Sequence, residues 1–496
     1  MRARHVQALA GLTLLAAILR FSTLDVQSYW FDEAVTVGLV KASFGHMISR
    51  IGGSESTPPF YYAVAWVWSR VFGTGEVGLR SLSALAGTAT VPVAYAAAAE
   101  LASKRTALLV GVLAAVNPLL IWYSQEARSY ALLLLLASAS FLLFVRMLRA
   151  PSVRGLVGWT VVSALALATH YFAGFLILPE AIWLFLRWRD RRQAALAIAA
   201  LVAVAGALLP LLLKQRSLEL ASFITGQSLI GRVLRVPKQY VVGYDAPADV
   251  VITAIAACLV LVGLWLAYTR LVGRERYAAR VCLVVGAVGV GAPLVLALAG
   301  ADYLDTRNVL GAWLPLMLVP SFGFGARNGG RTGPLAAGAL AAIGLFVSIA
   351  VSADPAYQRD DNRGLAHAIG PVTVPRAIVV TPGSAPTALG VYLQPFVLPR
   401  TQFLVVREVD VAALPARSST FTGLSLPPRG LPKAPPGPGL TLVERRFTRT
   451  YTLLRYRSPT PAPVTVGGLI NARLDPHPAA VIYQSAAARG RRPPGA

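Results

Sequence analysis

The amino-acid sequence predicts a mainly α-helical, polytopic membrane protein with a small α/β domain near its C-terminal end. Hydrophobic residues occupy 55% of the 496 positions and charged residues only 14%. The apolar residues gather into runs of roughly 16 to 23, the length at which a helix crosses a bilayer. From about residue 353 the apolar runs shorten to strand length, and 21 of the 34 prolines lie in the last 144 residues.

Eleven apolar segments are candidate transmembrane helices. They are 6–24, 79–100, 105–123, 128–145, 155–170, 171–187, 194–213, 248–270, 279–299, 307–326 and 333–352. The first has the basic start of a signal peptide but no small-residue cleavage site, so we expect it to stay as a helix. The apolar stretch 59–72 has only about fourteen residues, which is short for a span, and predicts an interfacial or re-entrant segment.

The net charge of +24 fits a membrane topology better than nucleic-acid binding. Most basic residues before position 353 lie in short connections between apolar runs, where the positive-inside rule places them in the cytoplasm. No basic stretch is interleaved with aromatic residues as a nucleic-acid groove requires. The connections 25–78, 124–128, 170/171, 214–247 and 300–306, together with everything after 352, should then be extracytoplasmic, with membrane lipids around the helices.

The composition divides the chain into three parts: a membrane domain over 1–352, an extracytoplasmic α/β domain over 353–457, and a tail over 458–496 that we expect to be disordered. In the second part, 377–381 and 403–409 are typical of strands, 440–457 of a hairpin, and 363–369 of a short helix. The two cysteines, Cys258 and Cys282, fall inside apolar segments, so neither a disulfide framework nor a cysteine-rich metal site is predicted.

Two adjacent acids follow the first helix and are candidates for chemistry. Asp32 and Glu33, in Tyr-Trp-Phe-Asp-Glu-Ala, are predicted to open an amphipathic helix at the membrane surface. Carboxylates at a helix start also favour the dipole and can cap free N–H groups, so a purely structural role is an alternative.

Other polar residues are predicted on the same side of the membrane. Glu126, Arg128 and Tyr130 belong to one motif at the outer end of the third span, and Glu126 could instead form a helix-terminal salt bridge. Arg80, Arg307 and the basic 214–247 connection run against the positive-inside bias. Guanidinium groups near a carboxylate pair suit binding of a lipid phosphate, although attraction to anionic head groups is an alternative. His170 lies at a predicted outer turn between two helices. It could bind a ligand or form a structural hydrogen bond, and the sequence leaves both open.

Five motifs follow one another along the chain: Trp30-Phe-Asp-Glu-Ala, Pro58-Pro59-Phe-Tyr-Tyr, Leu79-Arg80-Ser-Leu-Ser-Ala-Leu-Ala-Gly, Tyr123-Ser-Gln-Glu-Ala-Arg-Ser-Tyr and Thr169-His170-Tyr171-Phe. In this order they resemble the protein O-mannosyltransferase superfamily, and most closely its bacterial family 39-type branch of membrane glycosyltransferases with the GT-C fold. The resemblance covers about residues 1–320, and weakly Asp361-Asn-Arg-Gly-Leu-Ala onward.

The resemblance implies a polyprenyl- or dolichyl-phosphate sugar donor, an inverting transfer on the extracytoplasmic side, and a general base that falls on Asp32. The family often has histidine directly before the paired prolines. Thr57 stands there in this chain, and Glu55, two residues earlier, could take over part of that role.

The sequence thus predicts Asp32 and Glu33 as catalytic residues, with Arg128 and either Arg80 or Arg307 on the phosphate. The predicted substrate-binding residues are Glu55, Arg80, Glu126, Arg128, Tyr130, His170 and Arg307. Glu33 and Glu126 would position the acceptor or a divalent metal. No cofactor is assigned, and a divalent cation stays open because hard cations want several oxygen ligands.

The predicted function is transfer of a hexose or pentose, mannose included, from a polyprenyl-phosphate donor to a hydroxyl of a glycan, glycolipid or protein. One alternative is a transporter or flippase of lipid-linked sugars, although transporters tend to carry midplane polar groups and internal repeats. A non-catalytic membrane scaffold that displays the C-terminal domain is a second alternative. It leaves the coincidence of Asp32, Glu126 and Arg128 unexplained.

Overall fold

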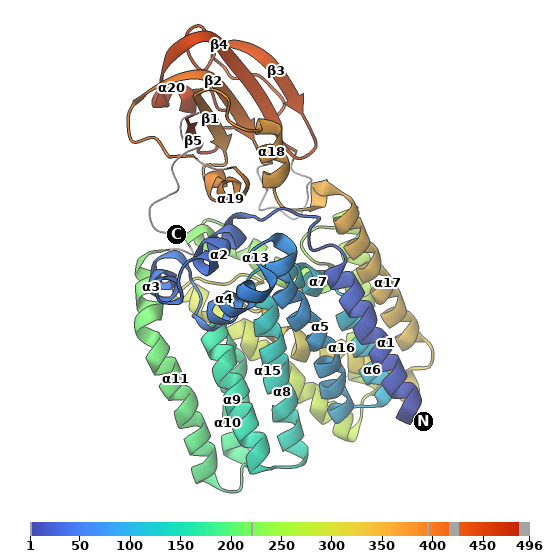
Figure 1. Ribbon diagram of the computed structural model, residues 1–496. Coiled ribbons are helices and arrows are strands. Elements are labelled where there is room, and N and C mark those ends of the chain that lie inside the picture. Colours follow the sequence, from blue (N-terminus) through green and yellow to red (C-terminus); the bar gives the residue numbers. More distant parts are fainter. Residues whose placement is uncertain (1, 220–221, 394–395, 416–425, 486–496) are drawn as a thin grey trace. The chain divides into compact units, whose positions relative to one another are not determined.

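The computed structural model describes residues 2–219, 222–393, 396–415 and 426–485, and the chain divides into two compact units (Figure 1). The first unit contains residues 1–24 and 43–350, and the second contains 25–42 and 351–496. The connection that carries Asp32 and Glu33 therefore belongs to the second unit, although the sequence predicts it as part of the membrane domain.

The first unit is helical, and a helix lies over each of the eleven predicted spans. Its elements are α1 (Arg2–Phe21), α3 (Phe44–Ser54), α4 (Phe60–Phe72), α5 (Glu76–Leu101), α6 (Lys104–Val116), α7 (Pro118–Ser124), α8 (Tyr130–Arg149), α9 (Val153–Thr169), α10 (Ala173–Arg187), α11 (Arg191–Ser217), α12 (Ser222–Thr225), α13 (Leu229–Val242), α14 (Asp249–Arg270), α15 (Gly273–Leu298), α16 (Trp313–Gly325) and α17 (Thr332–Ala353), with the 3-10 helices η1 (Leu310–Ala312) and η2 (Arg327–Gly329).

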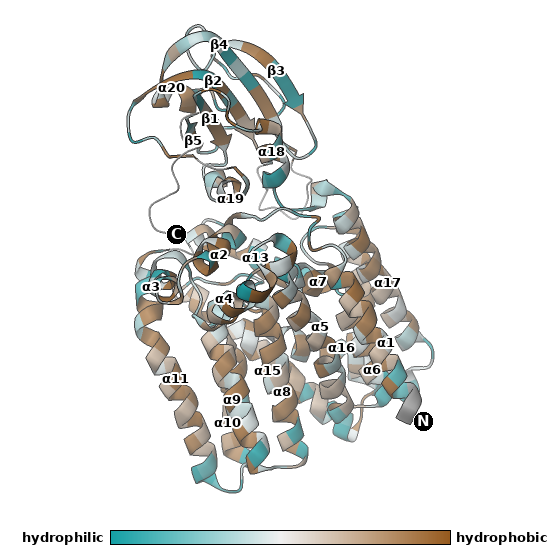
Figure 2. Cartoon of the chain, in the orientation of Figure 1, coloured by the Kyte–Doolittle hydropathy of each residue, from teal (hydrophilic) through white to brown (hydrophobic). Residues whose placement is uncertain are grey.

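The lengths and surfaces of these helices confirm the polytopic membrane class. Among the described residues, six helices are long and apolar enough to cross a membrane, and a seventh span results if the bent pair α6 and α7 is counted as one. In α11 and α14, only 6% and 17% of the most apolar stretch is buried in the protein. Figure 2 shows hydrophobic residues along most of α11. Helices that are apolar all round and uncovered by protein require lipid as their solvent.

The second unit contains a five-stranded mixed sheet among its described residues. Its helices are α2 (Phe31–Lys41), η3 (Pro355–Tyr357), α18 (Asn362–Ile369), α19 (Ala385–Tyr392) and α20 (Val466–Asn471), and its strands are β1 (Arg376–Thr381), β2 (Phe403–Ala413), β3 (Thr441–Phe447), β4 (Thr452–Thr465) and β5 (Ala480–Gln484). The strand order is β3-β4-β2-β1-β5, in which β1 and β2 are parallel and the other pairs antiparallel.

Both faces of this sheet are covered, which explains why β1 is buried at every position. Ala377 and Val379 join the apolar cluster that includes Leu469 of α20. Ile378 and Val380 join the opposite cluster, which includes residues of α18 and α19. The alternation of side chains along a strand produces this division, and it confirms the predicted α/β character.

The structure differs from the predicted tail. Strand β4 continues to Thr465, and α20 and β5 follow, so ordered elements extend well beyond residue 458. The prolines at 459, 461 and 463 do not break the strand. Because they are two residues apart, their missing N–H groups fall on one edge, and β3 pairs with β4 only as far as Arg457. Residues 486–496 of the predicted tail lie outside the described residues.

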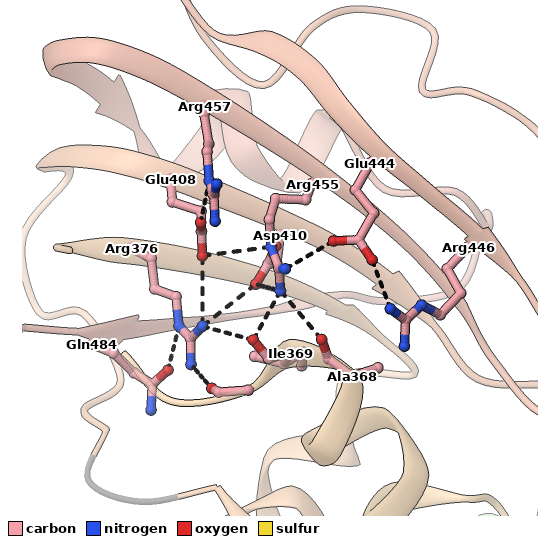
Figure 3. Close-up of polar contacts among 11 residues, drawn as sticks. Ala368, Ile369, Arg376, Glu408, Asp410, Glu444, Arg446, Arg455, Arg457 and Gln484 are labelled. Atoms are coloured by element: carbon pink, nitrogen blue, oxygen red, sulfur yellow. Dashed lines mark hydrogen bonds and ion pairs between the residues drawn. The ribbon is translucent and has the colours of Figure 1, made fainter. Parts of the chain in front are cut away.

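A network of charged side chains crosses one end of the sheet (Figure 3). Arg376 on β1 is 2% exposed, and its Nη1 lies 3.5 Å from Glu408 Oε1 and 3.9 Å from Asp410 Oδ2. Arg455 on β4 donates through Nε to Asp410 Oδ1 at 2.8 Å. Both arginines also donate to the Ile369 carbonyl at the end of α18, at 2.9 and 2.8 Å. The arginines therefore balance buried carboxylates and cap the helix at once.

Candidate active site

The acidic pair opens α2 in the second unit. Trp30 is the N-cap residue and its side chain makes no capping bond, while Asp32 and Glu33 are the second and third residues of the helix. Both carboxylates lie in the first turn, where the helix dipole favours negative charge. Glu33 is fully buried, whereas Asp32 is partly exposed. Asp32 is therefore the acid that a substrate reaches more easily.

The paired prolines lead into α4, which is thirteen residues long. Pro59 is the N-cap residue, a position where the missing N–H costs no helix hydrogen bond. The hydroxyl oxygens of Thr57 and Tyr62 lie 3.0 Å apart, and the Gln215 amide donates to the Thr57 carbonyl at 3.1 Å. Thr57, which stands where the family often has histidine, is thus part of a hydrogen-bonded group.

Glu55 and Arg128 form a buried ion pair. Glu55 is the C-cap residue of α3, and Arg128 lies in the turn between α7 and α8. Arg128 Nη1 donates to Glu55 Oε1 at 2.6 Å, and the two side chains are 5% and 3% exposed. The Arg128 guanidinium also lies 5.9 Å from the centroid of the Tyr62 ring. Because desolvation offsets most of the attraction in a buried pair, stability alone is a weak reason for it, and function is a stronger one.

A helix break places the turn that carries Arg128. Helices α6 and α7 meet at an angle of 54° around Asn117 and Pro118. Pro118 has no N–H, so the preceding turn of α6 is left with free carbonyls. The Arg20 side chain donates to the Ala114 and Ala115 carbonyls at 3.0 and 2.9 Å. The buried arginine of α1 therefore satisfies the groups that the break exposes.

The far end of α7 is also fixed. Gln125 donates through Nε2 to Thr23 Oγ1 at 2.6 Å, which joins this end to the chain after α1. On α5, a Cβ added at Gly87 would lie 1.9 Å from Ser124 Oγ, so only glycine permits the close approach of the two helices. The turn that follows is thereby held in place, and Glu126 within it is 1% exposed.

His170 is a buried neutral hydrogen-bond donor at the end of α9. Its Nδ1 accepts from the Phe172 N–H at 3.3 Å, which assigns the ring proton to Nε2. That Nε2 is buried and has no partner among the described residues. Burial, together with the positive charges of Arg307 and Arg128, lowers the pKa of His170 to about 3. The ring centroid lies 6.1 Å from that of Tyr130.

The other two predicted phosphate ligands have protein contacts of their own. Arg307 lies between α15 and η1, with Nε 3.6 Å from Asp305 Oδ1 and the guanidinium 4.6 Å from the Phe223 ring centroid. Arg80, on α5, is fully buried and donates through Nη1 to the Leu24 carbonyl at 2.7 Å. Arg80 thus forms a hydrogen bond with the backbone just after α1, which is a structural role.

The basic connection 214–247 is partly neutralised by local ion pairs. Arg232 on α13 is 2% exposed and pairs with Asp302. Lys238, also on α13, lies 2.8 Å from Asp249 Oδ1. These two cations therefore have a structural explanation within the protein, whether the rest of the connection serves a lipid phosphate or anionic head groups.

Tyrosines to which the sequence analysis gives no role lie beside the predicted residues. The hydroxyl oxygens of Tyr123 and Tyr244 are 2.5 Å apart, and the Tyr123 ring centroid lies 4.9 Å from that of Tyr130. Tyr62 is fully buried beside Arg128. Tyr62 and Tyr123 belong to motifs of the resemblance, which could have drawn attention to them, whereas Tyr244 has no sequence signal.

The predicted site residues divide between the two units. Asp32 and Glu33 are in the second unit, and the seven predicted substrate-binding residues are in the first. Within the first unit, Glu55 pairs with Arg128 and Tyr130 contacts His170. In the described part of the chain, no three histidine, cysteine, aspartate or glutamate side chains group closely enough to hold a metal ion.

Comparisons with known proteins agree with this architecture. Residues 56–213 match the family model described as dolichyl-phosphate-mannose-protein mannosyltransferase. None of the curated proteins matches the chain by sequence. Among solved structures, the chain is similar to ArnT from Cupriavidus metallidurans bound to undecaprenyl phosphate, with 12% identity and a TM-score of 0.51 over 90% of this chain and 97% of that one.

Two further structures match less of their own length. The apo state of ArnT aligns at 17% identity and a TM-score of 0.45, over 64% of this chain and 59% of that one. The Archaeoglobus fulgidus oligosaccharyltransferase in complex with Zn and sulfate aligns at 13% identity and a TM-score of 0.45, over 78% of this chain and 57% of that one. The chain thus spans less than two thirds of the length of these two proteins.

The family match covers the stretch that contains the diproline motif, Arg80, the Glu126–Arg128 turn and His170. The alignment with ArnT covers nearly all of both chains. The chain therefore has the GT-C fold of membrane glycosyltransferases, and residues 56–213 within it match the mannosyltransferase family model.

Proposed function

We propose that the protein transfers a sugar from a polyprenyl-phosphate donor to an acceptor hydroxyl, with inversion, on the extracytoplasmic side of the cell membrane. The sugar is a hexose or a pentose, with mannose among the candidates. The acceptor is a glycan, a glycolipid or a protein.

The observation that carries this proposal is the group around Arg128, a residue in the part of the chain that matches the mannosyltransferase family model. It combines a buried guanidinium, its Glu55 partner, and the buried N–H of a neutral histidine. Such a group suits an anionic ligand that is excluded from water. The family description names a dolichyl-phosphate donor, and the similar ArnT structure holds undecaprenyl phosphate.

In the proposed reaction, Asp32 is the general base. The acceptor oxygen attacks the anomeric carbon and gives its proton to the Asp32 carboxylate, while the bond from that carbon to the phosphate oxygen breaks. The lipid phosphate leaves with the negative charge. We assign Arg128 and Arg307 to stabilise that charge and His170 to donate a hydrogen bond to it. Arg80 is a weaker candidate because its guanidinium already binds the Leu24 carbonyl.

Glu33 and Glu126 are proposed to position the acceptor. The mechanism gives charge stabilisation to arginines and contains no metal step, so turnover should survive treatment with EDTA. Loss of turnover after chelation, restored by Mg²⁺ or Mn²⁺, would add a divalent cation to the site and give these two acids a ligand role.

The test is the variant Asp32→Asn in purified full-length protein with a synthetic polyprenyl-phosphate sugar. The amide cannot accept the proton, so we expect turnover to fall by roughly 10²- to 10⁴-fold or below detection. Thermal unfolding should match that of the wild-type protein. Wild-type turnover in this variant would refute the assignment of Asp32.

The same preparation separates transfer from transport. Reconstitution into vesicles that carry the donor in one leaflet measures donor movement across the bilayer. Movement without any glycosylated product would favour a flippase of lipid-linked sugars over a transferase.

A further inference from the structure

The connection that carries the candidate base is bound at its beginning by residues more than 300 positions away. Arg363, on α18, donates through Nη2 to the Asp25 carbonyl at 2.6 Å. The backbone N–H of Arg359 donates to Gln27 Oε1 at 3.0 Å. All four residues belong to the second unit. The entry of this connection is therefore tied to the segment that leads into the C-terminal sheet.

Closer to α2 the contacts continue residue by residue. Ser28 Oγ donates to the Asp360 carbonyl at 2.7 Å and accepts from the Asn362 N–H at 3.0 Å. The Asn362 side-chain amide donates to the Tyr29 carbonyl at 3.2 Å. Ser28, Tyr29 and Asn362 are all buried, so water cannot easily replace these bonds.

The last contacts fix the start of α2 itself. The Tyr29 N–H donates to the Tyr392 hydroxyl at 2.6 Å, and Tyr392 is the final residue of α19. The Arg359 guanidinium lies 5.5 Å from the centroid of the Trp30 ring. Helix α2 also packs against α19. Trp30 is the N-cap of α2, so these groups determine where the helix begins.

A helix of eleven residues depends on such contacts. Isolated helices shorter than about 12–15 residues are marginal in water, so the geometry of α2 must come from what it packs against. Asp32 lies two residues after Trp30, and each helical residue adds about 1.5 Å along the axis. Any displacement of the helix start is thus passed on directly to the Asp32 carboxylate.

We propose that the C-terminal domain holds Asp32 in its working position, with Asn362 and Tyr392 as positioning residues. This inference rests on the proposed function, since it assumes that Asp32 is the base. The domain is then a support for catalysis, in addition to any role in acceptor binding.

The variants Tyr392→Phe and Asn362→Ala remove the side-chain hydrogen bonds to Tyr29, and Asn362→Ala also removes a 3.3 Å hydrogen bond to the Asp360 carbonyl. The matched control is Thr452→Val, which removes a hydroxyl that donates to the Pro428 carbonyl at 2.8 Å elsewhere in the same domain. All are measured in full-length protein in nanodiscs. We expect kcat to fall at least about tenfold in the two positioning variants, because misplacement by about 1 Å can cost 10²-fold. The KM for the donor and the thermal midpoint should stay near those of the control.

A second measurement does not depend on activity. Hydrogen exchange of residues 29–41 should be faster in Tyr392→Phe and Asn362→Ala than in the wild type, and unchanged in Thr452→Val. Wild-type exchange in this segment together with wild-type kcat in both positioning variants would overturn the inference.

The two proposals can fail separately. In an Asp32→Asn background, the positioning variants should cause no further loss of residual turnover, because they act through the carboxylate that is already absent. A further proportional loss would show that Asn362 and Tyr392 act independently of Asp32 and would overturn the inference. Full activity of Asp32→Asn alone would refute the proposed function instead, while the exchange data would still report whether the domain orders the segment.

Discussion

At the scale of single residues, the Glu55–Arg128 pair is the clearest sign of a specialised site. A guanidinium that is 5% exposed needs a partner, and Glu55 supplies it at 2.6 Å. The carboxylate also holds the planar guanidinium in one orientation, which prepares its remaining N–H groups for two oxygens of an anionic ligand such as a phosphate. This gives Glu55 a physical role in the region where the family often has a histidine.

His170 should act as a hydrogen-bond donor and not as a base. With a pKa of about 3, the ring is neutral throughout the usual assay range, so the pH–rate profile should contain no step that belongs to it. We expect His170→Phe, which keeps an aromatic ring but has no N–H, to raise the KM for the donor by about tenfold, the effect of one lost buried hydrogen bond. His170→Gln should recover part of this loss. A profile in His170→Phe that lacks a step present in the wild type would contradict the assignment.

The sequence predicts some of these residues for physical reasons and misses others. Glu55 and Arg128 lie in short motifs with an ionisable residue close to apolar runs, a pattern that draws attention in any membrane protein. Arg232 belongs to the basic 214–247 connection, but its partner Asp302 is 70 positions away and cannot be predicted from local sequence. Tyr244 contacts Tyr123 across 121 positions, also without a local signal.

At the scale of elements, apolar runs in the sequence predict where the helices lie. They do not predict where a helix is interrupted, which depends on proline and on hydrogen bonds to distant side chains. The predicted span 105–123 is two helices, because Pro118 interrupts it and Arg20 satisfies the carbonyls that become free. The strands 377–381 and 403–409 follow from short apolar runs of strand length, and 377–381 is buried on both faces of the sheet. Strand β5 and helix α19 are short segments in a proline-rich region, and they depend on the completed sheet: β5 pairs with β1, and α19 packs on one face.

The charged network of the C-terminal sheet should make that domain sensitive to pH. Burial raises the pKa of Asp410 to about 6, although Arg455 acts in the opposite direction. The unfolded value is about 3.9. Between these values the folded domain binds more protons than the unfolded chain, so this residue's contribution to stability falls as the pH rises from about 4 to 6 and is constant above. The change is at most about 3 kcal/mol.

The variant Asp410→Asn isolates this contribution. Hydrogen exchange of β1 and β2 in the full-length protein measures the unfolding free energy of wild type and Asp410→Asn. As the pH rises from 4 to 6, the unfolding free energy of the wild type should fall relative to that of Asp410→Asn. Above about pH 7 the difference should be constant. Identical pH dependence in the two proteins would show that Asp410 keeps an ordinary pKa in the folded state.

At the scale of the whole molecule, each of the two units is built from two stretches that are separated along the chain. Residues 25–42 leave the helical unit, join the C-terminal one, and the chain then returns to form α3. No composition shift marks this exchange, because the segment is held by backbone and side-chain hydrogen bonds to residues near 360 and to Tyr392. The GT-C fold, by contrast, follows from motifs and helix order that the sequence contains in full.

The sidedness of the molecule is a property of the whole chain and can be tested as one. Basic residues gather in the connections between α8 and α9 and between α10 and α11, which the positive-inside rule assigns to the cytoplasm. The domain after α17 should then lie on the opposite side. In a background in which Cys258 and Cys282 are alanine, we introduce Ala150→Cys in the first of these connections or Lys433→Cys in the C-terminal domain, both at exposed positions. An impermeant maleimide should label Lys433→Cys in intact cells and Ala150→Cys only after permeabilisation. Labelling in the reverse order would move the proposed reaction to the cytoplasmic face, and labelling of both in intact cells would show a mixed topology.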